Sequence, residues 1–321
     1  MRVARRPRVL MGSALAAALA MSACSSAETE DAGGPVRIVA STNVWGAIAE
    51  AVAGEHATVT AIIEEPSVDP HSFEASPSDA AAITSAALVV YNGGGYDKFV
   101  DDVLSSSGNA IPAVDAFSLA ERAADTPEEA ATGGGGHDDH SGHAHGAINE
   151  HVWYDIAVAA ETAAAIAEQL AGIDPSNGAA YKANADTFRA RLTDVDSAIA
   201  TIADVNGDAA IVQTEPIAHY LIEAARLEDE TPAEFTRASE NGTDPSPTAL
   251  TEALDLLRDN RVRALIYNVQ TQDDVSQNLR ATAEESGIPV VEVTETLPEN
   301  TDYLTWMTAT VESLGRALQS P

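Results

Sequence analysis

The chain has 321 residues, of which 17 are basic and 50 are acidic, for a formal charge of −33. A field of that sign repels nucleic acids and other polyanions, which excludes them as partners, while it attracts cations without selecting a metal. The single cysteine, Cys24, excludes an intrachain disulfide and any zinc site built from cysteines. The length exceeds the usual size of one domain and predicts two lobes.

Residues 1–23 have the order of a secretory signal peptide. Four arginines at positions 2 to 8 precede the apolar run Val9–Met21, and small residues lead to Cys24. The apolar run is shorter than the ~20 residues that span a bilayer. Without this leader the formal charge becomes −37, since it carries four basic residues and no acidic one. We therefore expect the mature protein to be extracytoplasmic.

The cleavage region suggests a lipid anchor. Met21-Ser22-Ala23-Cys24 resembles a bacterial lipobox, in which leucine usually stands at the position of Met21. Acylation of Cys24 would attach the chain to the cell membrane. The alternative is an ordinary secretory peptide with a stray cysteine. Residues 24–35 are small, polar and acidic, and they predict a flexible tether. Nothing after the leader suggests a membrane-spanning helix.

From Val36 the chain alternates short β-rich runs with helical stretches, a pattern of α/β folds with mainly parallel sheets. Residues 36–173 form the expected N-terminal lobe. Its predicted strands are Val36–Ala40, Ala57–Ile63, Leu88–Tyr91 and Ile111–Val114. Its predicted helices lie near Val44–Ala53, after the cap Ser76-Pro77, at Tyr96–Leu104 and at Asp155–Ala171. The glycines Gly93–Gly95 indicate a tight turn, because a Walker or dinucleotide pattern is absent.

Residues 123–146 break this alternation. Four consecutive glycines from Gly133 precede four histidines, at His137, His140, His143 and His145. Such a composition cannot form a packed core and predicts a flexible loop. The loop, 133–146, is either a weak auxiliary site that collects metal ions or a fortuitous low-complexity insertion.

The longest predicted helix begins after Asp174-Pro175 and reaches about Ala203. Apolar residues separated by 7, 4, 3, 4 and 3 positions form one stripe along it: Tyr181, Phe188, Leu192, Val195, Ile199 and Ile202. A helix of this length extends roughly 40 Å, which is unusual inside one lobe. We expect residues 174–206 to link the N-terminal lobe to a C-terminal lobe at 207–321.

The C-terminal lobe repeats the α/β pattern. The expected strands are Ala209–Gln213, Ala264–Tyr267 and Pro289–Val293; the expected helices are Ile217–Ala225, one after Ser246-Pro247, Asp274–Glu285 and Asp302–Leu318. Ligands of open α/β sheets bind beyond the carboxyl ends of the strands. The loops after Ile63, Val114, Gln213 and Val293 are therefore the places to look for a site.

Metal-binding side chains follow these strands. His71 and Glu215 lie in the loops after Ile63 and Gln213, Glu295 follows Val293, and His151 comes after the histidine-rich loop. Each residue alone has an ordinary explanation as a surface or helix-start residue. Two imidazoles and two carboxylates together suit zinc, manganese or iron and do not suit Cu(I).

Three stretches resemble signatures of one bacterial family. They are Asp69-Pro70-His71 with Glu74 and Pro77, Asn92-Gly93-Gly94-Gly95-Tyr96, and Glu150-His151-Val152-Trp153. The family is that of the zinc/manganese ABC-transporter substrate-binding proteins, also called cluster A-I or cluster 9, and the resemblance runs from Val36 to Leu318.

The resemblance implies two parallel-sheet lobes, joined by one long helix, with the metal site in the cleft. It places the ligands at His71, His151, Glu215 and Glu295, although family members usually have an aspartate in the last position. A shift of one residue would place Thr294 there, and His219, one helical turn after Glu215, is an alternative to it. The implied function is not enzymatic. A monomer captures the metal, then delivers it to a membrane permease that is driven by a cytoplasmic ATPase.

The transported ligand is Zn²⁺ or Mn²⁺, and the evidence from the residues is divided. The histidine-rich loop favours zinc, whereas carboxylates in the third and fourth positions favour manganese. Of the two metals, we expect zinc. The alternatives to a transport receptor are a zinc hydrolase and a surface lipoprotein that buffers metal through the loop. Because imidazoles bind metals in their neutral form, affinity should fall below about pH 6.5.

Overall fold

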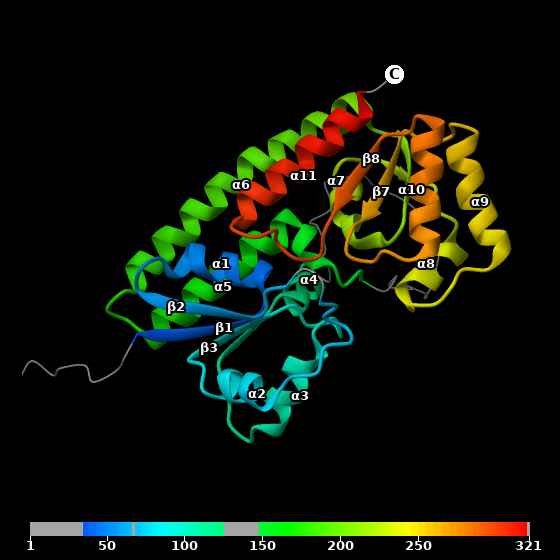
Figure 1. Cartoon of the computed structure of the whole chain (residues 1–321). Coiled ribbons are helices and arrows are strands. Elements are labelled where there is room, and N and C mark those ends of the chain that lie inside the picture. Colours follow the sequence, from blue (N-terminus) through cyan, green and yellow to red (C-terminus); the bar gives the residue numbers. More distant parts are fainter. Residues whose placement is uncertain (1–34, 66–67, 125–147, 320–321) are drawn as a thin grey trace, which may run out of the picture. The chain divides into compact units, whose positions relative to one another are not determined.

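Two parallel four-stranded sheets organise this computed structural model, which describes residues 35–65, 68–124 and 148–319 (Figure 1). The first sheet has the order β2-β1-β3-β4 and the second β6-β5-β7-β8. The strands are β1 Val36–Thr42, β2 Ala57–Ile63, β3 Leu88–Tyr91, β4 Ala113–Asp115, β5 Ala210–Gln213, β6 Glu228–Asp229, β7 Ala264–Asn268 and β8 Val290–Val293. Because all pairings are parallel, the carboxyl ends of each sheet's strands meet at one edge. The predicted α/β class is confirmed.

Helices connect the strands, as parallel pairing requires. They are α1 Asn43–Ala53, α2 Pro77–Thr84, α3 Lys98–Ser106, α4 Ala116–Ala124, α5 Ile156–Ile173, α6 Gly178–Asn206, α7 His219–Ala224, α8 Ala233–Glu240, α9 Pro247–Arg258, α10 Asp274–Ser286 and α11 Tyr303–Leu318. The cap predicted for α2 is a full capping box. The Ser76 hydroxyl accepts from the backbone N–H of Asp79, and the Asp79 carboxylate accepts from that of Ser76.

The inner strands β1 and β3 of the first sheet are buried on both faces. Ile38 and Ala40 of β1 belong to the main hydrophobic core with α1 and α5, whereas Val39 between them packs in a second cluster with Ile83 of α2. This alternation follows from the period of two along a strand. Helices on both faces leave the strand ends free to carry polar side chains.

The long helix α6 buries the predicted stripe, whose residues from Tyr181 to Ile202 are at most 7% exposed. It packs on two helices that precede it in the sequence, α1 and α5, and on two that follow it, α7 and α11. It runs beside α11 (Figure 1). One hydrophobic core therefore extends along it and includes residues of both sheets. Residues from Pro35 onward form one compact unit, so the lobe boundaries at 173 and 207 stay a prediction.

By its length and composition alone, helix α5 could cross a membrane. From the sequence, no such helix is expected after the leader. Its apolar residues pack in the main core, among them Val158, Ile166 and Leu170. Like α1, it contacts both the first sheet and α6. The burial of these residues in the protein core accounts for the apolar composition of α5.

Among the described strands and α-helices, three were not predicted from the sequence: α4, β6 and α8. Strand β6 has two residues, both exposed, so it has no alternating pattern. Helix α8 buries a single side chain, Phe235, and has no side-chain capping hydrogen bond at its N-terminus. Short elements of this kind are determined by their neighbours, which no local pattern reports.

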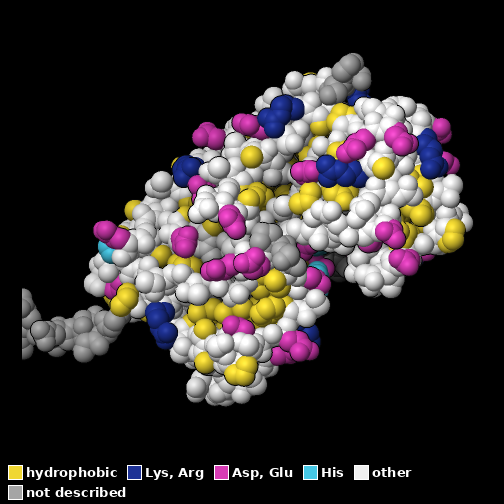
Figure 2. All heavy atoms as spheres, in the orientation of Figure 1, with side chains coloured by type: hydrophobic (Ala, Val, Ile, Leu, Met, Phe, Trp, Pro, Cys, Tyr) yellow, Lys and Arg dark blue, Asp and Glu magenta, His cyan; other side chains and the backbone are white. Residues whose placement is uncertain are grey.

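The acidic residues are spread over the surface. Figure 2 shows Asp and Glu side chains scattered over the visible face, without a single patch. Several basic side chains pair with acids on their own helix, such as Lys98 with Asp102 and Arg280 with Glu284. Exposed pairs of this type contribute at most about 1 kcal/mol each. Most of the acidic charge is thus a solvated surface.

Candidate metal site

His71 lies in a turn after β2 that its neighbour Asp69 stabilises. The Asp69 carboxylate accepts from the backbone N–H of His71 at 2.9 Å and from the hydroxyl of Ser72 at 2.9 Å. The His71 ring packs edge-on against Tyr96, with ring centroids 4.8 Å apart. These contacts hold a partly exposed imidazole in place at the carboxyl end of the first sheet.

His151 is buried, with 6% of its surface exposed, and its partner is Asn149. The Asn149 side-chain oxygen lies 2.9 Å from the backbone nitrogen of His151 and 2.8 Å from its Nδ1. A carbonyl oxygen can only accept, so Nδ1 carries the proton and Nε2 keeps its lone pair for a metal. Burial lowers the pKa of His151 to about 3, and the ring is therefore neutral at physiological pH.

Asn149 is itself fixed by the chain around Glu215. Its side-chain nitrogen donates to the Pro216 carbonyl at 3.2 Å, and its own carbonyl accepts from the Tyr220 hydroxyl at 2.6 Å. The segment that carries His151 is thus tied to the start of α7, 67 or more residues later in the chain.

The glycine turn after β3 places Tyr96 at the site. The buried Asp97 carboxylate accepts from the backbone N–H groups of Asn92 and Gly93 at 2.7 and 2.8 Å. All three glycines have positive φ, and a Cβ on Gly94 would lie 2.5 Å from the Phe117 ring. The predicted tight turn with close backbone approach is confirmed.

Glu295, which follows β8, has a hydrogen-bond donor on each oxygen. Tyr96 donates its hydroxyl to Oε2 at 3.1 Å, and Asn268 donates its side-chain N–H to Oε1 at 2.9 Å. The backbone N–H of Glu295 donates to the side-chain oxygen of Gln270. Burial raises the pKa of Glu295. The carboxylate is therefore oriented by both halves of the chain.

Glu215 follows β5 and shares the Asn268 amide with Glu295. Burial, the largest cause, raises the pKa of Glu215 to about 7, and the nearby Glu295 carboxylate adds to the increase. One buried amide nitrogen thus lies between two carboxylates that would otherwise repel each other.

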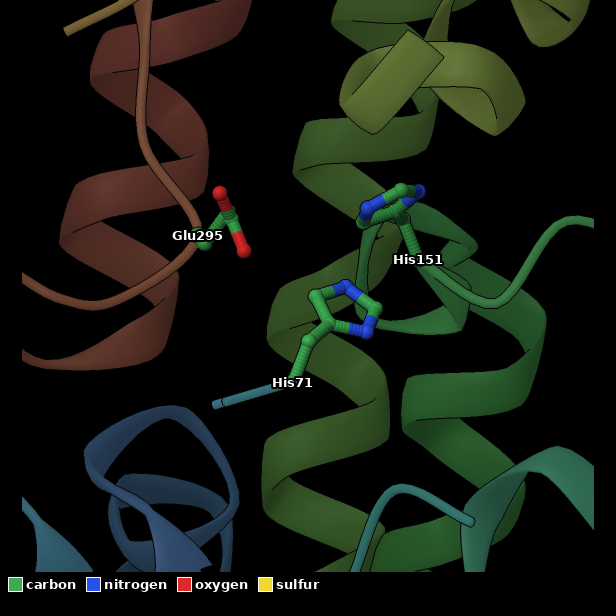
Figure 3. A group of neighbouring side chains, drawn as sticks. All are labelled: His71, His151 and Glu295. Carbon is green, nitrogen blue, oxygen red and sulfur yellow. The ribbon is translucent and has the colours of Figure 1, made fainter. Parts of the chain in front are cut away.

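Three of the four predicted residues converge. Ligand atoms of His71, His151 and Glu295 all lie within 4.8 Å of one another, and Figure 3 shows the three side chains pointing toward one another. Glu215 is outside that group, although it lines the same pocket of about 590 Å³. Imidazole nitrogens with carboxylate oxygens form a donor set that suits zinc or manganese.

The two alternative ligands, His219 and Thr294, are outside the converging group and have other partners. His219 Nε2 is 3.5 Å from Glu223 one turn further along α7, where both side chains are substantially exposed. The Thr294 hydroxyl accepts from the Trp306 indole at 3.0 Å. The histidines at 137, 140, 143 and 145, and Cys24, lie outside the described residues.

Sequence reasoning missed the residues that hold these side chains, above all Asn149, Asn268 and Glu150. Asn268 ends β7, and the carboxyl end of that strand was not among the loops selected. Its position in a buried parallel strand was a usable signal, because neighbouring strand ends share one edge. Glu150 was noted only as part of a motif, yet its carboxylate lies 3.6 Å from His71 Nε2.

Curated proteins of similar sequence include a zinc uptake protein and a manganese-binding lipoprotein. The high-affinity zinc uptake system protein ZnuA of Yersinia pestis is 28% identical over 178 residues, which are 51% of this chain and 55% of that protein. The manganese-binding lipoprotein MntA of Halalkalibacterium halodurans is 25% identical over 182 residues, or 56% of this chain and 54% of that protein. The chain thus spans about half the length of these curated relatives.

Solved structures show the same fold over a longer stretch. The periplasmic zinc-binding protein TroA of Treponema pallidum superposes with a TM-score of 0.72 at 15% identity, covering 89% of this chain and all of that one. The family model described as the periplasmic component A of the zinc-uptake complex, ZnuA, matches residues 38–317. That match covers nearly every described residue, and the chain belongs to this family.

Proposed function

We propose that this protein is the extracytoplasmic substrate-binding component of a metal ABC transporter, and that it captures zinc or manganese and delivers it to a membrane permease. The observation that carries the proposal is the convergence of His71, His151 and Glu295 in one pocket, from three distant segments of a chain in this family. The relatives' names support both metals, since one is a zinc uptake protein and another a manganese-binding lipoprotein.

The proposed ligands are His71, His151 and Glu295, with Glu215 joining them. The Asn268 side chain donates to both Glu215 and Glu295. A small movement of the Glu215 side chain would therefore bring its carboxylate to the metal. A divalent cation between the two carboxylates would also relieve their repulsion. The permease and the cytoplasmic ATPase are the expected partners of such a component.

Calorimetry of the metal-free protein with Zn²⁺ and Mn²⁺ tests this site. We expect His151→Ala to lower the affinity for both metals by about 100-fold or more. The substitution removes a buried imidazole whose Nδ1 is held by Asn149 and whose Nε2 has its lone pair available for the metal. His219→Ala is the matched control, since that imidazole pairs with Glu223, and it should bind as the parent does. Equal affinities of parent and His151→Ala would refute the assignment.

The alternatives make different predictions. The matched family is an uptake component, which gives a zinc hydrolase no support. A buffering lipoprotein would lose its metal binding on deletion of residues 133–146, whereas the proposed receptor keeps its high-affinity site. We further propose that Cys24 carries the lipid anchor and that the protein is monomeric. Cys24→Ala should release the protein from membranes.

A further inference from the structure

Glu150 is a carboxylate that the assigned ligand set leaves out. Its Oε1 lies 3.6 Å from Nε2 of His71, and its side chain lines the same pocket as His71, His151, Glu215 and Glu295. The Glu150 backbone is fixed independently, because its carbonyl accepts from the Asn92 side chain at 2.9 Å. This hydrogen bond fixes the main chain at Glu150, and the carboxylate lines the pocket.

The separation between Glu150 and His71 fits a shared cation. Two donor atoms that are each about 2.1 Å from one metal are roughly 3.0 Å apart in octahedral geometry and 3.4 Å apart in tetrahedral geometry. A distance of 3.6 Å is longer than a good hydrogen bond and close to this range. Glu150 lies outside the group formed by His71, His151 and Glu295, so its side chain would have to move to reach an ion that those three residues share.

The electrostatic surroundings of Glu150 also call for a cation. Its side chain is 29% exposed, and besides His71 the charged groups that act on it are the carboxylates of Glu240 and Glu295. A partly buried carboxylate among other carboxylates is costly unless a positive charge joins them. His151 lines the same pocket, and its described side-chain hydrogen bond goes to Asn149.

We propose that Glu150 is a further metal ligand and that it makes the site richer in oxygen. This inference rests on the proposed function and extends its donor set to two imidazoles and three carboxylates. A larger, harder ion with a coordination number above four gains most from the additional oxygen. Glu150 thus raises the affinity for Mn²⁺ relative to Zn²⁺.

The test compares Glu150→Gln with Glu240→Gln in the purified full chain. Both substitutions remove one negative charge from the same pocket, but Glu240 has no contact with the imidazoles among the described interactions. Competition calorimetry with Mn²⁺ and Zn²⁺ should give at least a tenfold loss of Mn²⁺ affinity in Glu150→Gln, with a smaller loss for Zn²⁺. Glu240→Gln should change both affinities alike, by about threefold at most.

Bound Co²⁺ gives a direct readout of coordination. Its visible absorption is weak in five- or six-coordinate sites and intensifies in four-coordinate ones, so Glu150→Gln should intensify it. An unchanged spectrum, or equal effects of the Glu150 and Glu240 variants on the two metals, would overturn the inference. The proposed function fails separately, if His151→Ala leaves metal binding intact.

Discussion

The Asn268 amide contacts both candidate carboxylates, Glu215 and Glu295, and so prepares them for a metal. We expect Asn268→Ala to lower metal affinity by about 10- to 100-fold, the usual effect of removing a group that orients a ligand. Two carboxylates without a shared donor would move apart. Calorimetry measures the affinity, and the melting temperature reports whether the variant is folded.

A double-mutant cycle separates positioning from a general loss of stability. If Asn268 acts through Glu215, its substitution should have a smaller effect in a Glu215→Ala background. Gln272→Ala is a suitable control, because that exposed amide bonds only the Val269 carbonyl among the described contacts. Independent, additive effects of the two substitutions would contradict the coupling.

The pH dependence of binding has a contribution from Glu215 that the sequence did not indicate. Burial holds His151 neutral down to about pH 3, so it does not compete for protons near neutrality. The carboxyl of Glu215, with a pKa raised to about 7, is protonated in the metal-free protein below that pH and must lose its proton to bind a cation.

We therefore expect metal affinity to be near its maximum at pH 8 and to fall below about pH 7, by up to tenfold per pH unit for one displaced proton. Competition calorimetry at pH 8, 7 and 6 measures the slope, and Glu215→Gln should reduce it. A constant affinity over this range would show that Glu215 is ionised in the metal-free protein or remains unbound.

Among the elements, the glycine turn between β3 and α3 offers a matched pair of positions. Gly94 and Gly95 both have positive φ, but a Cβ on Gly94 meets Phe117 whereas one on Gly95 meets nothing within 4 Å. Gly95→Ala should cost about 1 kcal/mol through backbone strain alone. Gly94→Ala should cost roughly 3 kcal/mol, because the Phe117 ring has to move. Thermal or denaturant unfolding gives the two values, and equal losses would disprove the close approach.

At the scale of the whole molecule, Asn43 joins the first helix to the loop that carries Glu295. Its side chain accepts from the Leu297 N–H at 2.9 Å and donates to the Leu297 carbonyl at 3.0 Å. Asn43→Ala should destabilise the protein by about 1–3 kcal/mol and speed hydrogen exchange of the Leu297 amide. It should also weaken metal binding, because Glu295 would lose its fixed position.

Asn206→Ala is the control for this contact. Asn206 ends α6 and donates to the Leu318 carbonyl at 3.3 Å, and neither residue contacts a candidate ligand among the described interactions. Its substitution should affect stability without changing metal affinity. Loss of affinity in both variants would mean that global stability, and not the Asn43 contact, determines binding.

Much of the fold was predictable because it depends on local patterns. The spacing of apolar residues from Tyr181 to Ile202 predicted α6, and the β-rich run Leu88–Tyr91 predicted β3 with its observed bounds. Ser76 and Pro77 predicted the N-terminus of α2, where the structure shows a capping box. Elements without such a signal, such as β6 with two exposed residues, could not be predicted, since their pairing partners lie elsewhere in the chain.

The sequence by itself determined the class of fold, the family and the residue types of the site. These follow from periodicity and from motifs around His71 and His151, which are local properties. Only the tertiary structure decided which side chains meet. It brought Glu295 to the two imidazoles, left His219 outside that group, placed Glu150 at the same pocket and put the Asn268 amide between Glu215 and Glu295. Distances between residues far apart in sequence depend on how the strands and helices pack, and no local pattern encodes them.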